Sequence, residues 1–333
     1  MRFLKTSIPF AFALSFGTSA AAETTLADHS STPTQWLAKP WGEVGLLQLA
    51  AAPYPDDTRT TGFESKNGRF DYKDHYDDPT VVVAIPTGFK PAATVDVILH
   101  FHGWSNEAAK ALDAYHFGEQ LQASGKNAIV ILPQGPKNSK DSGIGKIAKP
   151  GGMKQLIDEA LDVLSRDGKL TTPTTLRNIV LSGHSGAYFA MGQCLDVGGY
   201  QDKVTDLWIW DAAYGQWPQF ARWAAARPPA AMRLRSIFTD HLVNSNLRIM
   251  SLLSLSGIRF VTLHEDDLVS TASEKQDAFI YRGAKSGSYQ LPAILHQEPV
   301  VFLHTRLVHD RVMDEKNYFQ IFCQDTPSLE PRP

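Results

Sequence analysis

The chain has 333 residues, of which 43% are hydrophobic and 20% are charged, and its formal net charge is −3. This composition provides for a large hydrophobic core that needs neither disulfides nor metals to support it. Mild acidity excludes a strongly basic, polyanion-binding protein, so we expect no binding of nucleic acid.

The first 22 residues have the pattern of a secretory signal peptide. Arg2 and Lys5 precede an apolar run over residues 8–16, and small residues follow up to Ala22. This order is typical of a signal with an A-x-A cleavage site. Because the apolar run is too short to span a bilayer, we expect cleavage near Ala22 and no membrane anchor. The protein is therefore predicted to be secreted or periplasmic.

The remainder is predicted to contain one domain. Residues 23–60, rich in Thr, Ser, Ala and Pro, are interpreted as an extended N-terminal lead-in, and residues 61–333 as a single α/β domain. Short β-branched runs alternate with stretches of helical periodicity, and several of the runs lack polar alternation. Such runs are typical of strands in a mostly parallel central sheet with helices on both faces. Strands are expected at 81–86, 95–101, 128–133, 178–182, 206–210, 234–239, 259–263 and 300–304, and helices at 107–124, 153–165 and 187–195.

A candidate nucleophile follows the strand expected at 178–182. Residues 183–187 read Gly-His-Ser-Gly-Ala, a G-x-S-x-G pattern with alanine in the last place. In such a strand–turn–helix the small neighbours allow a serine to sit on a strained turn, with its hydroxyl above the sheet. The helix start behind Ser185 also directs N–H groups towards developing negative charge. An incidental serine on an ordinary turn is the alternative, but the flanking strand and helix favour a nucleophilic Ser185.

An oxyanion site is predicted upstream of the serine. The strand expected at 95–101 ends in His102-Gly103-Trp104. In serine hydrolases with this turn, the loop after an earlier strand supplies one oxyanion N–H, and the residue after the nucleophile supplies the other. The N–H groups of Trp104 and Gly186 are therefore the predicted donors. The alternative is an ordinary strand-to-loop turn with His102 in the core.

Five segments stand out together: HFHGW (100–104), NAIVILPQGP (127–136), SGHSGAY (182–188), DAAYG (211–215) and HDRVM (309–313). They resemble the α/β-hydrolase superfamily, and more narrowly a group of secreted bacterial hydrolase-like proteins whose activities are mostly unassigned. The resemblance covers about residues 81–322. It implies an α/β-hydrolase fold and a catalytic triad in the order Ser, acid, His along the chain. The substrate is not implied, because this fold hosts esterases, lipases, peptidases and non-catalytic relatives.

The triad order requires a histidine near the C-terminus. His309 follows the last predicted strand and is the predicted general base. His304 and His264 are better explained as histidines at strand ends, and His296 is a more distant candidate. A base in the loop after the final strand fits the resemblance best.

The acid is left open between three aspartates. Asp211 directly follows the strand expected at 206–210, within the DAAYG segment, and is favoured. Asp267 has the placement after a later strand that is more common in the superfamily, and Asp240 is a third option. Any one of them has the alternative role of a loop carboxylate or helix cap.

The leading prediction is a serine hydrolase that cleaves carboxylic esters of a small-molecule or polymeric acyl substrate through an acyl-enzyme on Ser185. A peptidase or amidase with the same triad, or a non-catalytic binding protein of this fold, is the alternative. No cofactor is expected, and no metal site, because the histidines lack zinc-binding spacing. Tyr214 and Trp217 are candidates for a substrate pocket. Cys194 and Cys323 are expected to remain separate thiols, since the resemblance places their helices on opposite faces of the sheet.

Overall fold

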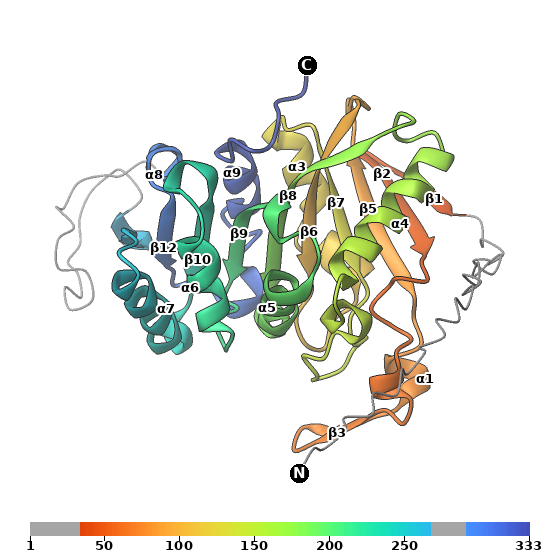
Figure 1. Ribbon diagram of the computed structural model, residues 1–333, viewed down its shortest axis with the longest axis horizontal. Coiled ribbons are helices and arrows are strands. Elements are labelled where there is room, and N and C mark those ends of the chain that lie inside the picture. The colour runs from red at the N-terminus through yellow and green to blue at the C-terminus, as the bar shows by residue number, and fades with distance from the viewer. Residues whose placement is uncertain (1–33, 268–290) are drawn as a thin grey trace, which may run out of the picture. The chain divides into compact units, whose positions relative to one another are not determined.

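The computed structural model describes residues 34–267 and 291–333 (Figure 1). The chain divides into two compact units, Met1–Thr32 and Pro33–Pro333, and the description concerns the second. The predicted signal peptide, residues 1–22, lies outside the described residues.

A mixed sheet forms the centre of the described part of the chain. Seven neighbouring strands, from β7 to β11 in the order below, are parallel, whereas β1, β2 and β5 each run antiparallel to their neighbours. The architecture is thus α/β with a mostly parallel sheet, as predicted, and an antiparallel edge. In spatial order the ten strands are β1 (Gln35–Lys39), β2 (Gly42–Gln48), β5 (Thr80–Pro86), β7 (Ala128–Pro133), β6 (Thr94–Phe101), β8 (Thr175–His184), β9 (Val204–Trp210), β10 (Arg233–Phe238), β12 (Val300–His304) and β11 (Val261–His264).

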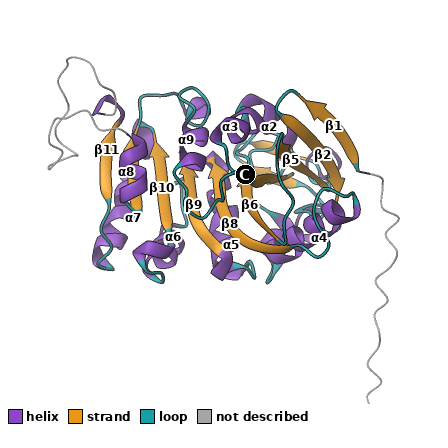
Figure 2. Cartoon of the chain, turned by 90° about the horizontal axis from the view of Figure 1, so that it is seen from above, coloured by secondary structure: helices purple, strands orange, loops and turns teal. Residues whose placement is uncertain are grey.

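Helices cover both faces of this sheet (Figure 2), and a hydrophobic core lies against each face. No helix in the described part of the chain combines the length and the apolar character that a bilayer crossing requires. One core receives side chains from α4 (Gly152–Arg166), α5 (Tyr188–Val197), α6 (Trp217–Ala225) and α7 (Val243–Leu255). The other receives side chains from α2 (Ala108–Ala114), α3 (Phe117–Ser124), α8 (Leu291–Gln297) and α9 (Tyr318–Gln324). A small hairpin and a short helix precede β5, namely β3 (Phe63–Ser65), β4 (Gly68–Phe70) and α1 (Tyr72–His75).

The two cysteines lie in different cores. Cys194 on α5 packs in the first core and Cys323 on α9 packs in the second, and both are buried, free thiols. The prediction of two separate thiols is confirmed.

Two boundaries differ from the expectations. Residues 35–48, within the predicted lead-in, form β1, which pairs with β2, and β2, which pairs with β5. Val44 and Leu47 of β2 point to opposite faces of the sheet and pack in the two cores. The helix expected over 107–124 is two helices, since His116 adopts a left-handed conformation (φ 52°) between them.

The carboxyl ends of the parallel strands lie together at one end of the sheet. Phe101 at the end of β6 lies opposite Gly183 of β8, and His184 lies opposite Trp210 at the end of β9. Phe238 of β10 lies opposite His304 of β12. Side chains that directly follow these strands therefore meet at the carboxyl ends of the strands, which is the usual location of sites in open α/β sheets.

The last described segment of the chain covers the amino ends of the central strands. Asp96 on β6 and Asp206 on β9 are carboxylates that are both 1% exposed. The backbone N–H of Glu330 donates to Asp96 (3.2 Å), and the hydroxyl of Ser328 donates to Asp206 (2.6 Å). The side chain of Asn178 on β8 donates to the carbonyl of Ser328 (2.8 Å). Residues 326–332 thus satisfy polar groups at the starts of three neighbouring strands.

Candidate active site

Ser185 lies on the tight turn between β8 and α5. It begins a short 3-10 helix, Ser185–Ala187, and has a φ of +55°, which is rare for a residue with a side chain. The glycines around it are sterically required. A Cβ on Gly183 would lie 2.8 Å from the Cβ of Ala187, and a Cβ on Gly186 would lie 2.4 Å from the Trp104 ring. The G-x-S-x-A segment therefore forms the strained strand–turn–helix that the sequence predicts.

The loop after β6 packs directly on this turn. A Cβ on Gly103 would lie 2.7 Å from the Cβ of Ser185, so only glycine allows the approach. The indole of Trp104 lies against Gly186 and donates to the Ser142 hydroxyl (2.8 Å). The structure therefore brings Trp104 and Gly186, the residues with the two predicted oxyanion N–H groups, into contact with each other beside Ser185.

His102 holds this loop in place. Its Nε2 accepts the N–H of Gly135 (3.0 Å), so Nδ1 carries the proton and donates to the carbonyl of Gly103 (2.8 Å). Burial lowers the pKa of His102, which keeps the ring neutral and this tautomer intact. Because the Gly103 carbonyl belongs to the same peptide plane as the Trp104 N–H, His102 fixes the direction of that donor.

His309 and Asp211 form a close pair at the carboxyl ends of β12 and β9. The Nδ1 of His309 lies 2.6 Å from Oδ2 of Asp211. Asp211 is fully buried, has a φ of +44°, and also accepts the backbone N–H (2.9 Å) and the hydroxyl (2.8 Å) of Thr239. Burial acts to raise the pKa of Asp211, but the hydrogen bonds from His309 and Thr239 outweigh it and hold the pKa below its ordinary value. The carboxylate is therefore ionised and accepts the Nδ1 proton of His309, which leaves Nε2 as a base.

The other candidate acids are placed differently. Asp240 is 91% exposed at its side chain and lies 2.7 Å from Nε2 of His304, not at His309. Asp267 ends the 3-10 helix Glu265–Asp267, at the limit of the described residues, and its side chain lies outside them. Of the described carboxylates of the three candidates, the one that the structure brings to His309 is that of Asp211.

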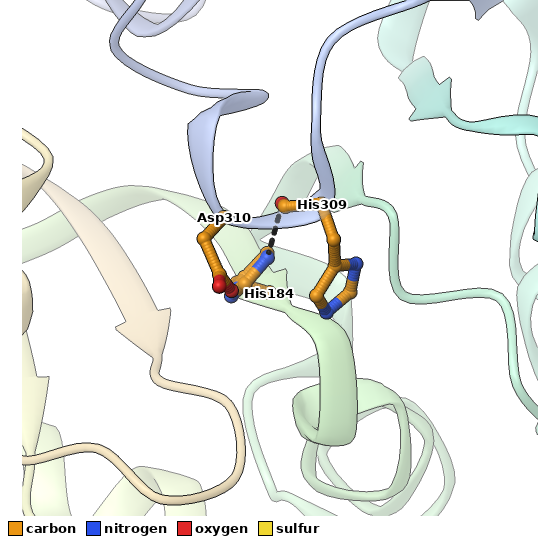
Figure 3. Close-up of side chains that lie close together, drawn as sticks. All are labelled: His184, His309 and Asp310. Atoms are coloured by element: carbon orange, nitrogen blue, oxygen red, sulfur yellow. Dashed lines mark hydrogen bonds between the residues drawn. The ribbon is translucent and has the colours of Figure 1, made fainter.

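His184, the variable residue of the serine motif, supports the histidine loop. Its Nε2 donates to the backbone carbonyl of His309 (3.0 Å), as the dashed line in Figure 3 shows, and the two rings lie 4.6 Å apart. Its Nδ1 accepts the hydroxyl of Tyr115 (3.2 Å). Burial, together with the proximity of His309, lowers the pKa of His184 to about 4, so the ring stays neutral. The motif drew attention to this position only as a spacer, and its contact with His309 spans 125 residues of sequence.

A buried carboxylate anchors the same loop from its other side. Glu265 accepts the hydroxyl of Thr305 (2.8 Å), the backbone N–H of Arg306 (3.0 Å) and the hydroxyl of Tyr318 (2.8 Å), and pairs with Lys316 (2.6 Å). Burial acts to raise the pKa of Glu265, and these partners lower it below its ordinary value. Residues on both sides of His309 are thus tied to one charge, a role that the sequence did not indicate.

Tyr214 lies beside His309 and His241. Its ring is edge-on to that of His309 at 6.3 Å, and its hydroxyl lies 2.6 Å from Nε2 of His241. Burial and the charge of Asp211 raise the pKa of Tyr214 to about 12, although a hydrogen bond from Ser185 acts to lower it. Within the described part of the chain, Ser185 makes no hydrogen bond to Nε2 of His309. Such contacts often form only in the substrate complex.

The second predicted pocket residue is less accessible. The indole of Trp217 donates to the carbonyl of Ala213 (2.6 Å), the guanidinium of Arg248 lies 4.4 Å from its ring, and the ring packs against the first core. A pocket instead opens beside the oxyanion loop, and neither Tyr214 nor Trp217 is among its lining residues. It is lined by Phe101, His102, Gly103, Trp104, Pro133, Gly135, Pro136, Asp141, Ser142, Gly143, Ile144, Gly186, Ala187 and Ala190.

Two groups of described side chains have the composition of a metal site. They are His184, His309 and Asp310 (Figure 3), and Asp211, His241 and His309, each with ligand atoms within 4.8 Å of one another. In both groups hydrogen bonds already engage the Nδ1 of His309, and in the first they engage both nitrogens of His184. The residues therefore form a protein hydrogen-bond network and not an open set of ligands.

The sequence matches no family model and no curated protein. Among solved structures, the chain is similar to a feruloyl esterase module from Clostridium thermocellum, with 8% identity and a TM-score of 0.45 over 85% of this chain and 93% of that one. It is also similar to the fluorophosphonate-binding serine hydrolase F of Staphylococcus aureus, with 10% identity and a TM-score of 0.46 over 88% of this chain and 99% of that one. A third is an S-formylglutathione hydrolase from Agrobacterium tumefaciens, with 11% identity and a TM-score of 0.40 over 87% and 95% of the two chains. All three are α/β-hydrolases, the superfamily that the motifs of this chain resemble.

Proposed function

We propose that this protein is a serine hydrolase that cleaves carboxylic esters, with Ser185, His309 and Asp211 as its catalytic triad. The observation that carries the proposal is the 2.6 Å contact between His309 and the buried Asp211, at the carboxyl ends of the strands, where Ser185 sits on a strained turn. Maintaining an ionised carboxylate in a buried position and a serine at positive φ costs stability, and such features are concentrated at functional sites.

The reaction follows from the hydrogen-bond directions. His309 accepts the Ser185 proton at Nε2, the serine oxygen attacks the ester carbonyl, and Asp211 stabilises the resulting imidazolium. The N–H groups of Trp104 and Gly186 would receive the negative charge of the tetrahedral intermediate, and each such donor typically contributes about 3 kcal/mol. His309 then protonates the leaving alcohol, and water releases the acid from the acyl-enzyme.

Hydrolysis of short p-nitrophenyl esters and labelling by a fluorophosphonate probe test this proposal together. We expect both in the wild-type protein and neither in Ser185→Ala, while the exposed Ser256→Ala serves as a matched control with full activity. Labelling at Ser185 without ester turnover would move the substrate class to amides, as in a peptidase or amidase. A folded wild-type protein that shows neither labelling nor turnover would refute an enzymatic role and favour a binding protein of this fold.

We further propose that the protein acts outside the cytoplasm on a small-molecule or polymeric acyl substrate. The support is the signal-like pattern of residues 1–22. Expression in a bacterial host tests the location, since the mature protein should begin at Glu23 and be recovered from the periplasm or the medium. Recovery of the uncleaved chain from the cytoplasm alone would contradict it.

A further inference from the structure

A second histidine beside the proposed triad is part of a directed chain of hydrogen bonds. The ionised carboxylate of Asp211 can only accept, so the Thr239 hydroxyl donates its proton to it (2.8 Å). The Thr239 oxygen must then accept from Nδ1 of His241, which lies 2.6 Å away. With a proton on Nδ1, the other ring nitrogen, Nε2, is the acceptor of this tautomer, and the Tyr214 hydroxyl donates to it (2.6 Å).

The direction of this chain decides what Tyr214 can offer at the site. Its only proton is committed to His241, so its phenolic oxygen retains acceptor capacity alone. The Tyr214 ring lies edge-on to that of His309, with ring centres 6.3 Å apart, and the ring of His241 lies 5.4 Å from that of His309. Tyr214 is 41% exposed, so part of its side chain faces solvent beside the proposed base. A hydrogen-bond acceptor is therefore held next to the proposed base.

We propose that Tyr214 orients the water that hydrolyses the acyl-enzyme, and that His241 and Thr239 are positioning residues for its hydroxyl. This inference rests on the proposed function. An attacking water has two protons. Nε2 of His309 accepts one as the water oxygen bonds to the acyl carbon, and the Tyr214 oxygen accepts a hydrogen bond from the other. The bond between the acyl carbon and Ser185 then breaks, and His309 returns its proton to the serine oxygen. The second water proton stays on the carboxylic acid product.

Methanol as the attacking nucleophile distinguishes a role of Tyr214 in orienting water from a general effect of Tyr214 on acylation or on the fold. As an alternative nucleophile methanol carries a single O–H proton, which must go to His309, so it has none left for Tyr214. Loss of the Tyr214 hydroxyl should therefore slow attack by water but not attack by methanol. A single hydrogen bond of ordinary strength corresponds to about a tenfold change in rate.

The experiment measures the ratio of methyl ester to free acid formed from p-nitrophenyl butyrate in buffer that contains methanol. We expect Tyr214→Phe to raise this ratio about tenfold, with the initial burst of p-nitrophenol unchanged. Tyr188→Phe makes the same chemical change on a neighbouring ring, 6.1 Å from that of Tyr214, and should leave the ratio unaltered. His241→Leu should raise the ratio, whereas His241→Gln, which can both donate and accept, should restore it.

Three results would overturn the inference. An unchanged ratio in a folded Tyr214→Phe would exclude a contact with the water. Parallel losses of hydrolysis and methanolysis would assign the hydroxyl to acylation or to the fold. A wild-type protein without an acyl-enzyme would refute the proposed function and this role with it, and fluorophosphonate labelling of Ser185 separates that case from the other two.

Discussion

Replacement of Asp211 by asparagine should abolish most activity through the tautomer of His309. The carboxylate oxygen Oδ1 accepts the backbone N–H of Thr239 (2.9 Å), which can only donate, so the asparagine oxygen must take that position. The amide nitrogen then occupies the position of Oδ2, 2.6 Å from Nδ1 of His309. A donor at that distance requires Nδ1 to accept, which places the ring proton on Nε2. His309 then has no lone pair for the Ser185 proton.

The magnitude follows from the loss of a correctly oriented base. Such a change typically costs about 10⁴-fold in turnover, equivalent to about 5.5 kcal/mol at 1.36 kcal/mol per tenfold change. The assay is the turnover of a short p-nitrophenyl ester, with thermal unfolding to verify the fold. Asp240→Asn is the matched control, because that carboxylate is 91% exposed and pairs with His304, and it should retain wild-type turnover. A folded Asp211→Asn that keeps more than about a tenth of the activity would refute the tautomer argument and make Asp267 the next acid to test.

Three further outcomes are expected. Gly103→Ala should lower kcat about 100-fold or more, because its Cβ would lie 2.7 Å from that of Ser185 and must displace the oxyanion loop; wild-type kcat in this variant would contradict the packing. The pKa of His184 is lowered to about 4 in the folded protein, so the unfolded chain takes up the proton first. The stability that the neutral His184 contributes is therefore complete above about pH 6.5. It is lost as pH falls towards 4, by about 3 kcal/mol in the free energy of unfolding. His184→Gln should flatten this pH dependence of stability, measured by urea titrations at several pH values. Burial raises the pKa of the thiols of Cys194 and Cys323, so neither should react with a disulfide reagent in the native protein, and both should react after unfolding in guanidinium; rapid native reaction would contradict their burial.

The strands and the serine turn were predictable because their signals are local. All eight strands expected from short β-branched runs are present, and Ser185 lies between a strand and a helix as its glycines required. The pairing of His309 with Asp211 was predicted only in part, since chain order and placement left Asp267 and Asp240 open. What favours Asp211 in the structure is its 2.6 Å contact with a residue 98 positions away.

The residues that the sequence did not reveal act across long separations. Glu265 anchors the His309 loop through partners 40 to 53 residues away, and no motif surrounds it. His241 joins the site because β10 lies beside β9, an arrangement that depends on the pairing of whole strands. The strands β1 and β2 were missed for a different reason. β1 is the outermost strand and is largely exposed, and the short apolar piece in β2 (GEVGLLQ) is interrupted by Gly45, so neither has the continuous β-branched run that marks the central strands.

Because residues 326–332 cover the amino ends of the central strands, these strands are expected to consolidate late in folding. Asp206 leaves the ribosome long before Thr326 and Ser328, the residues whose hydroxyls donate to its carboxylate. Until those partners arrive, completing β9 would bury a carboxylate with too few donors, which disfavours early consolidation of this part of the sheet. The nascent chain should therefore stay incompletely folded through most of its synthesis and consolidate only when this late segment is free. In practical terms, a truncation that removes residues 326–333 should be far more damaging than an extension added after Pro333.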